Sequence, residues 1–193
     1  MRKKYDKQDI IEKGSILVRQ RGYHNTGIND ILKEVGIPRG SFYNFFESKE
    51  QFGEEILTYY GESQREWIKT RFAEKDGSAL EKILHFYTKV SSSNEGEDYR
   101  FGCLVNNLST EVGGLVDPLA EVSNRQFEGW LEEISSIMAK GQKDGSIRSD
   151  IPATELADFV HTSFHGSQSR MKMQRSGVSI ERFLKMIKTF LTP

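Results

Sequence analysis

Hydrophobic residues recur along this chain at intervals of three and four, the period that places side chains on one face of an α-helix. The pattern is clear over residues 8–21 and again at Ile28, Ile31, Leu32 and Val35. No segment alternates convincingly between apolar and polar residues, so the sequence predicts no strand. The pattern therefore predicts an all-α protein.

Residues that start and stop helices divide this pattern into elements. Gly22 and Gly36 end the first two helices, and the hydroxyl of Thr26 is expected to cap the second one. A capping box at residues 48–51 opens the fourth helix. The polar stretch 91–98 is expected to be a flexible connection. The predicted helices cover about 8–21, 28–35, 39–45, 49–73, 79–91, 101–112, 117–140, 153–175 and 179–191.

The first three predicted helices have the layout of a helix-turn-helix. The third is too short to be stable alone, so it must be held by packing of Ile37, Phe42 and Phe46 against the second. That packing leaves the opposite face free to enter a DNA major groove. This face carries small, donor-rich or cationic residues, namely Arg39, Gly40, Ser41, Tyr43 and Asn44.

The run over residues 26–50, with Gly22 and Tyr23 before it, resembles the DNA-binding signature of the TetR family of transcriptional regulators. The resemblance implies phosphate contacts from Thr26, Tyr43 and Lys49, and positions facing the bases at Arg39, Gly40, Ser41 and Asn44. Lys49 has an independent reason as well, because a cation beside a helix N-terminus forms an anion site with its amides. Two departures are Phe45, where the family often has His or Tyr, and Leu32, where a small Ala is common.

The resemblance also implies an organisation and a function. Residues 1–48 would form the helix-turn-helix DNA-binding domain, and residues 49–193 a helical domain for effector binding and dimerisation. A homodimer through the last two helices would reach the two half-sites of a palindromic double-stranded DNA operator, about 34 Å apart. The expected protein is a repressor that a small molecule releases from its operator. The sequence does not identify that effector.

Candidate effector contacts are the aromatic and polar residues of the middle helices, since ligand pockets are mainly apolar with few polar groups. Most of them are expected to be ordinary core. The candidates are Tyr60, Trp67, Phe86, Tyr87, Cys103, Asn107, Phe127, Trp130 and Phe164.

Cys103 leaves alternatives open. Residues 101–108 resemble a segment of a TetR subgroup that includes electrophile-responsive repressors, and a sensor of that kind needs an accessible thiolate. The other interpretation is a small buried residue. An enzyme using Cys103 with His85, His161 or His165 would lack a recognisable nucleophile motif. His161 and His165, four residues apart, have no clear third metal ligand. No catalytic residue, metal or cofactor is therefore predicted, and a helical adaptor without DNA binding is the remaining alternative.

Charge and composition are compatible with DNA binding at the N-terminal end of the chain. The net charge is −1, but residues 1–50 carry ten Lys/Arg against seven Asp/Glu. Acidic groups farther along the chain are screened over about 8 Å at physiological salt, so the charge distribution permits DNA binding at this end. The basic residues 2–4 could form an arm to DNA or a solvated terminus. One cysteine, no membrane-spanning run and no apolar signal core lead us to expect a cytoplasmic protein.

Overall fold

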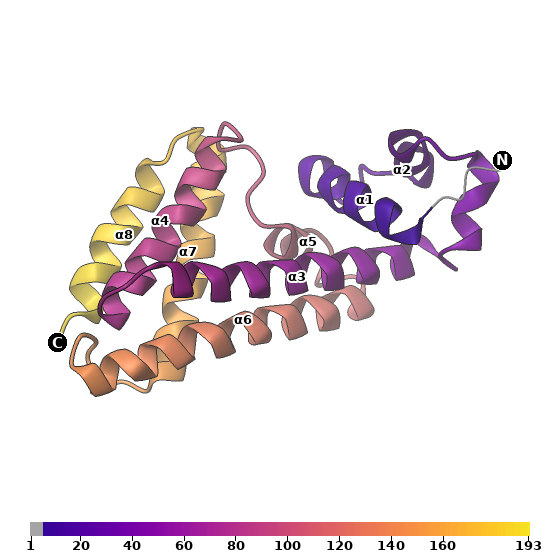
Figure 1. Cartoon of the computed structure of the whole chain (residues 1–193). Coiled ribbons are helices and arrows are strands. Elements are labelled where there is room, and N and C mark those ends of the chain that lie inside the picture. Colours follow the sequence, from indigo (N-terminus) through magenta and orange to yellow (C-terminus); the bar gives the residue numbers. More distant parts are fainter. Residues whose placement is uncertain (1–5) are drawn as a thin grey trace. The chain divides into compact units, whose positions relative to one another are not determined.

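The computed structural model describes residues 6–193, apart from the side chain of Arg39. Throughout the described residues the regular elements are helices, which confirms the all-α prediction (Figure 1). The basic residues 2–4 lie outside the described part. In chain order the helices are α1 (Lys7–Arg21), α2 (Ile28–Val35), the 3₁₀ helix η1 (Arg39–Asn44), α3 (Lys49–Glu74), α4 (Ala79–Glu95), α5 (Leu104–Val112), α6 (Asp117–Asp144), α7 (Ala153–Gln174) and α8 (Val178–Leu191).

The cap of α2 corrects the prediction made for Thr26. The N-cap residue is Gly27, whose amide donates to the Asp30 carboxylate at 2.8 Å. The Thr26 hydroxyl instead donates to the carbonyl of Gly22 at 2.7 Å. The Thr26 side chain therefore points back toward the end of α1. A threonine hydroxyl can donate to a nearby carbonyl as readily as it can accept from the free amide of a following helix.

The polar stretch after residue 90 is also more helical than predicted, because α4 continues to Glu95. Its side chains find partners within the helix: Asn94 donates to the carbonyl of Val90 at 2.8 Å, and Ser92 donates to that of Thr88 at 3.2 Å. Polar residues can therefore extend this helix without leaving their donors unsatisfied.

The chain forms two compact units, each of which combines distant segments. Unit 1 contains the described residues up to Ser63 together with Cys103–Phe127, and unit 2 contains Gln64–Gly102 and Glu128–Pro193. Helix α5 and the first part of α6 therefore belong to the same unit as the helix-turn-helix. The predicted domain boundary between residues 48 and 49 stays a prediction.

The core of unit 1 is built from the apolar faces of its short helices. Helix α1 packs against α2 and α5, and α2 packs against η1. Ile10, Val18 and Ile31 are fully buried. Gly14 is required in α1, because the ring of Phe52 occupies the space where a Cβ would lie. Burial of each of these aliphatic side chains contributes about 1.5–3 kcal/mol to the free energy of folding. This contribution stabilises helices that would be only marginally stable alone.

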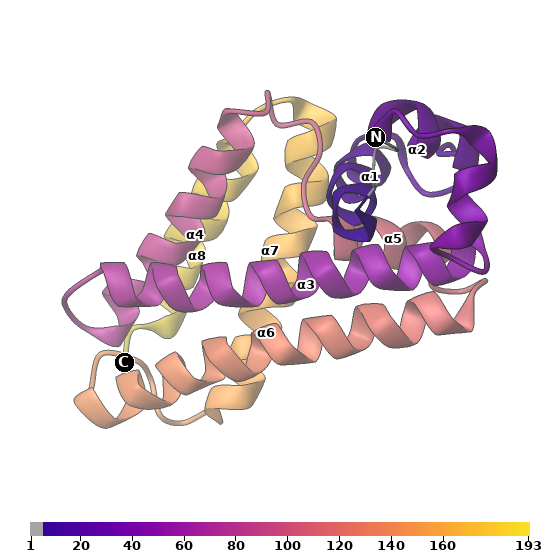
Figure 2. The same cartoon turned by 45° about the vertical axis from the view of Figure 1, so that its right-hand side comes forward.

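The core of unit 2 lies between α4, α7 and α8, which run side by side (Figures 1 and 2). Tyr87 of α4 is fully buried at its centre. The ring centroid of Tyr87 lies 4.9 Å from that of Phe164 and 5.1 Å from that of Phe183. Aromatic rings at these separations attract one another beyond the effect of burial alone, so Tyr87 ties the three helices together.

Candidate DNA-binding surface and effector site

Phe42 of η1 and Phe46 just after it are buried, as the sequence predicts, and they form a ring cluster with Phe52 of α3, which the sequence did not predict. Phe42 and Phe46 are 0% and 1% exposed. Their ring centroids lie 5.1 Å apart, and the ring of Phe52 from α3 lies 5.8 Å and 5.2 Å from them. This cluster fixes the rotation of the short helix about its axis, because turning the helix would expose the Phe42 ring to water.

The outer side of η1 is open. Tyr43 is 65% exposed, Gly40 and Asn44 are exposed, and Ser41 is partly exposed. A Cβ built on Gly40 would meet nothing within 4 Å. The side chain of Arg39 lies outside the described part of the chain. The structure thus gathers on one accessible side the other four positions predicted to face DNA.

The helix type at η1 corrects the prediction of an α-helix over 39–45. Ser41 donates its amide to the carbonyl of Pro38, and Phe45 donates to that of Phe42, both at 2.9 Å. These are bonds to the third preceding residue, which define a 3₁₀ helix and suit segments too short for several α-turns. The element ends at Asn44, one residue before the predicted end.

Lys49 lies at the N-terminus of α3, beside the loop that joins α1 to α2. Its ammonium donates to the carbonyl of Tyr23 at 2.7 Å and lies 4.4 Å from the centroid of the Tyr23 ring. Partial burial lowers the pKa of Lys49, and the nearby Glu111 and Asp30 carboxylates oppose that effect. An ammonium has three donors, so one bond to Tyr23 leaves capacity for a phosphate.

Thr26 is fully buried in the same loop. Its hydroxyl donates to Gly22, as described above, and its amide donates to the carbonyl of Tyr23 at 3.3 Å. Both donors therefore have partners inside unit 1. The phosphate contact of Thr26 stays a prediction.

Glu111 of α5 holds this loop in a way that the sequence did not indicate. Its carboxylate accepts from the amide of Tyr23 at 2.9 Å and from the amide of His24 at 2.7 Å. A carboxylate on two backbone amides forms charge-assisted hydrogen bonds, which are stronger than neutral ones. Glu111 therefore links α5 directly to the helix-turn-helix within unit 1.

The predicted effector residues fall into two groups. Tyr60, Cys103, Asn107 and Phe127 belong to unit 1, and Trp67, Phe86, Tyr87, Trp130 and Phe164 belong to unit 2. Within unit 2 several of them touch, with ring centroids 5.6 Å apart for Trp67 and Phe86 and 4.8 Å apart for Phe86 and Tyr87. The role of these residues in effector binding stays a prediction.

Cys103 is 8% exposed and serves as the N-cap residue of α5. Burial raises the pKa of its thiol, although hydrogen bonds from backbone amides and from the Tyr60 hydroxyl act in the opposite direction. A reactive cysteine needs a lowered pKa and access to solvent. The environment of Cys103 is that of a buried neutral thiol.

A buried chain of polar groups crosses the core of unit 2. The Tyr87 hydroxyl lies 3.2 Å from His161 Nδ1, and His161 Nε2 lies 3.3 Å from His165 Nε2. His165 Nδ1 lies 3.1 Å from Gln168 Oε1. A neutral imidazole has one donor and one acceptor, so His165 donates to Gln168, His161 donates to His165, and Tyr87 donates to His161. All three hydrogen bonds can therefore form with both imidazole rings neutral.

Protonation of either ring is unfavourable in this setting. Burial lowers the pKa of His165 to about 4, and burial together with the charge of His165 lowers the pKa of His161 well below its ordinary value. A proton on both rings would also set two N–H groups against each other at the contact between the Nε2 atoms. Within the described residues, no group of three or more His, Cys, Asp or Glu side chains is placed to hold a metal ion.

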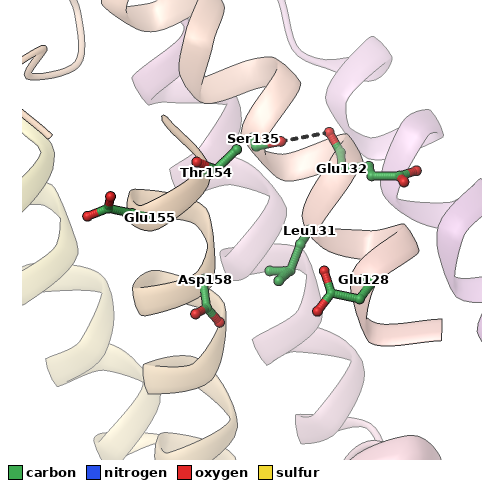
Figure 3. Close-up of a pocket in the computed structure, with 7 residues that line it drawn as sticks. All are labelled: Glu128, Leu131, Glu132, Ser135, Thr154, Glu155 and Asp158. Atoms are coloured by element: carbon green, nitrogen blue, oxygen red, sulfur yellow. Dashed lines mark hydrogen bonds between the residues drawn. The ribbon is translucent and has the colours of Figure 1, made fainter. Parts of the chain in front are cut away.

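A separate groove of about 310 Å³ in unit 2 lies between α6 and α7 (Figure 3). Four of its lining residues are acidic, and the Ser135 hydroxyl at its edge donates to the backbone carbonyl of Glu132 at 3.1 Å. Such a lining disfavours an anionic ligand. The residues that line it are Glu128, Leu131, Glu132, Ser135, Thr154, Glu155 and Asp158.

Two family models match most of the chain. Residues 10–56 match the model described as bacterial regulatory proteins of the tetR family. Residues 79–187 match the model described as the tetracyclin repressor-like C-terminal domain. The chain belongs to the TetR family. Regulators of this family bind operator DNA and act as dimers, so the chain is a DNA-binding transcriptional regulator.

Individual relatives agree with this assignment. The TetR-family chain is 31% identical to the HTH-type transcriptional repressor DhaR of Mycobacterium sp. (strain GP1), over 97% of this chain and 92% of that protein. Its fold matches the regulatory protein TetR from Rhodobacter sphaeroides, with a TM-score of 0.89, 24% identity and coverage of 96% and 98% of the two chains. It also matches the reduced form of E. coli NemR, with a TM-score of 0.86, 24% identity and coverage of 96% and 97%.

The relatives named by these comparisons are transcriptional repressors or regulatory proteins. In the described part of this TetR-family chain, no helix is both long enough and apolar enough to span a membrane.

Proposed function

We propose that this protein is a repressor that holds a palindromic operator through the outer side of η1 and leaves it when a small molecule binds. The observation that carries the proposal is the division of η1 into two sides. Phe42 is fully buried, while Tyr43 is 65% exposed and a Cβ on Gly40 would meet nothing within 4 Å. A short helix with one side packed in the core and the other exposed to solvent can insert its exposed side into a DNA major groove.

In this proposal the contacts divide by chemistry. Tyr43 and Lys49 bind phosphates with a hydroxyl and an ammonium, and Thr26 supports them from the loop. Backbone contacts of this kind fix the register on the duplex, and contacts to base edges supply the sequence preference. The residues on the base-facing side are Arg39, Gly40, Ser41 and Asn44.

The proposed dimer forms through α7 and α8, the last two helices. Large apolar side chains on these helices are exposed to solvent: Phe159 at 55%, Met173 at 75%, Val178 at 40% and Met186 at 64%. A Cβ on Gly166 of α7 would meet nothing within 4 Å, so a partner helix can approach closely there. Pairing with a second copy would remove this apolar surface from water.

The proposed mechanism is a shift between two arrangements of the dimer. The effector binds better to the arrangement in which the two copies of η1 no longer match successive major grooves. A coupling of about 1–3 kcal/mol would lower operator affinity 5- to 150-fold. A regulator of this kind works where the DNA is, which in our proposal is the cytoplasm.

A reversibly bound effector is favoured over the two alternatives based on Cys103. Burial raises the pKa of this thiol, so the thiolate needed to attack an electrophile is scarce at neutral pH. The same property argues against Cys103 as the nucleophile of an enzyme.

Selection from a random library of DNA duplexes tests the proposed function. The wild-type protein is expected to enrich a two-fold symmetric sequence whose half-sites are centred about 10 base pairs, or a multiple of that, apart. Fluorescence anisotropy on the enriched duplex should show an affinity that falls steeply with added salt, because phosphate contacts release counterions. Absence of an enriched sequence would contradict DNA recognition, and enrichment of an asymmetric site bound by one chain would contradict the dimer.

A further inference from the structure

A second groove, of about 360 Å³, lies between α5 and the first part of α6, wholly within unit 1. Its volume is within the range of small-molecule sites, about 300–1,000 Å³. Only Phe127 among its lining residues belongs to the effector candidates predicted from the sequence. The lining residues are Val105, Asn106, Ser109, Gly113, Ala120, Ser123, Asn124 and Phe127.

The lining of this α5–α6 groove has a distinct chemistry. None of the eight described residues that form it is ionisable, whereas four of the seven in the groove of Figure 3 are acidic. Val105, Ala120 and Phe127 supply apolar surface, and two asparagines and two serines supply neutral polar groups. A charged ligand would lose its hydration here without gaining a counter-charge, so the lining suits an uncharged one.

Ser123 is an unsatisfied polar group among these lining residues. The residue is 4% exposed, and its hydroxyl has no hydrogen-bond partner among the described residues. Other helical serines of this chain, such as Ser63 and Ser167, donate to the carbonyl four residues earlier. A buried hydroxyl without a partner is unfavourable and uncommon in folded proteins. Its presence in a groove wall is explained if a ligand supplies the partner.

We propose that the α5–α6 groove binds a small uncharged molecule with an apolar body and one hydrogen-bonding group, such as a hydroxyl or a carboxamide. The apolar body packs against Val105, Ala120 and Phe127. The Ser123 oxygen is closed to solvent, so rotation about its Cα–Cβ bond must first turn it toward the groove. The hydroxyl can then donate to a carbonyl of the ligand or accept from a hydroxyl.

The groove also has a direct route to the DNA-binding residues of unit 1. Ser109 and Gly113 line the groove, and Glu111 lies between them on α5 and holds the amides of Tyr23 and His24. A ligand inserted between α5 and α6 shifts Glu111 and therefore the loop that it holds. This part of the inference rests on the proposed function, because it identifies the groove as the place where an effector lowers DNA affinity.

The test uses the full-length protein and five small probes of similar size. Benzyl alcohol and benzamide are uncharged and can hydrogen-bond, toluene is uncharged but cannot, and benzoate and benzylammonium are charged. Chemical shifts of backbone amides, recorded by NMR during titration, locate each probe and give its dissociation constant. The first two probes are expected to shift amides of residues 105–127, and the other three are expected to bind at least about tenfold more weakly.

Ser123→Ala is the informative variant, and Ser136→Ala, an exposed serine on the same helix outside the groove, is its matched control. Ser123→Ala should weaken benzyl alcohol and benzamide binding about 3- to 10-fold, which is the loss of one neutral hydrogen bond. Its melting temperature should stay at or above that of the wild type, because no partner is lost. Ser136→Ala should bind as the wild type does.

The outcomes separate the groove from the proposed function. Equal binding by Ser123→Ala and the wild type, or no shifts at residues 105–127 with either uncharged polar probe, would overturn the groove assignment. Anisotropy on the selected duplex is measured first without a probe, and lack of binding there would overturn DNA recognition alone. If the duplex binds, benzyl alcohol should lower its affinity in the wild type and less in Ser123→Ala. An unchanged affinity at saturation would overturn the coupling through Glu111.

Discussion

Replacing Phe42 with alanine is expected to destabilise unit 1 by about 3–5 kcal/mol and to abolish DNA binding, because it removes the ring that holds η1 in place. Phe42 is fully buried, and its ring contacts both Phe46 and Phe52. The loss is a large fraction of the 5–15 kcal/mol that typically separates folded from unfolded domains. Urea unfolding followed by circular dichroism measures it, together with anisotropy on the selected duplex.

Tyr43→Ala is the matched control from the opposite side of the same helix. Tyr43 is 65% exposed, and its ring touches Phe42 only edge-on, with centroids 5.5 Å apart. The free energy of unfolding should therefore change by less than about 1 kcal/mol, while DNA affinity falls. The opposite pattern, with a stable Phe42→Ala and a destabilised Tyr43→Ala, would mean that the two sides of η1 have been assigned the wrong way round.

Acidification is expected to destabilise unit 2 through the buried pair His161 and His165. Burial lowers the pKa of His165 to about 4, whereas an unfolded chain titrates near 6.5. Between these pH values the unfolded chain binds more protons than the folded one. The contribution of His165 to stability is therefore fully present above pH 6.5 and is lost as the pH falls toward 4. The difference corresponds to about 3 kcal/mol for His165, and His161, whose pKa is lowered too, adds to it.

Urea unfolding at a series of pH values between 4 and 7 measures this dependence. In His165→Gln one titrating group is removed while a hydrogen-bonding side chain is kept, so stability should fall less steeply over this range. Ser136→Ala changes an exposed, non-titrating side chain of unit 2 and should keep the wild-type dependence. A His165→Gln variant with the same slope as the wild type would show that the buried pair does not govern the acid response.

The spacing of hydrophobic residues predicted those features that depend only on residues close together in the sequence. The pair Phe42 and Phe46 is separated by one helical turn, and their burial follows from that spacing. The cap of α2 was missed because Thr26 has two competing partners at similar sequence distance. Propensity rules do not decide between them.

The hydrophobic pattern could not predict contacts between residues that are far apart in the sequence. The carboxylate of Glu111 meets amides 87 and 88 residues away, and the Tyr87 hydroxyl meets a ring 74 residues away. Glu111 looks like any other polar residue on a short amphipathic helix. Ser123 was missed for the same reason, because a serine on α6 is expected to face water until the neighbouring helix is placed.

Comparing Gly40→Leu with Gly114→Leu shows whether the open side of η1 faces DNA. A Cβ at either exposed glycine meets nothing within 4 Å, so both variants should fold with melting temperatures close to the wild type. A leucine at Gly40 occupies the space assigned to the duplex, and a leucine at Gly114 does not. The prediction is that Gly40→Leu loses about 100-fold or more in affinity for the selected duplex, the worth of one or two base contacts, while Gly114→Leu retains it. Wild-type affinity in Gly40→Leu would mean that this side of η1 does not face the duplex.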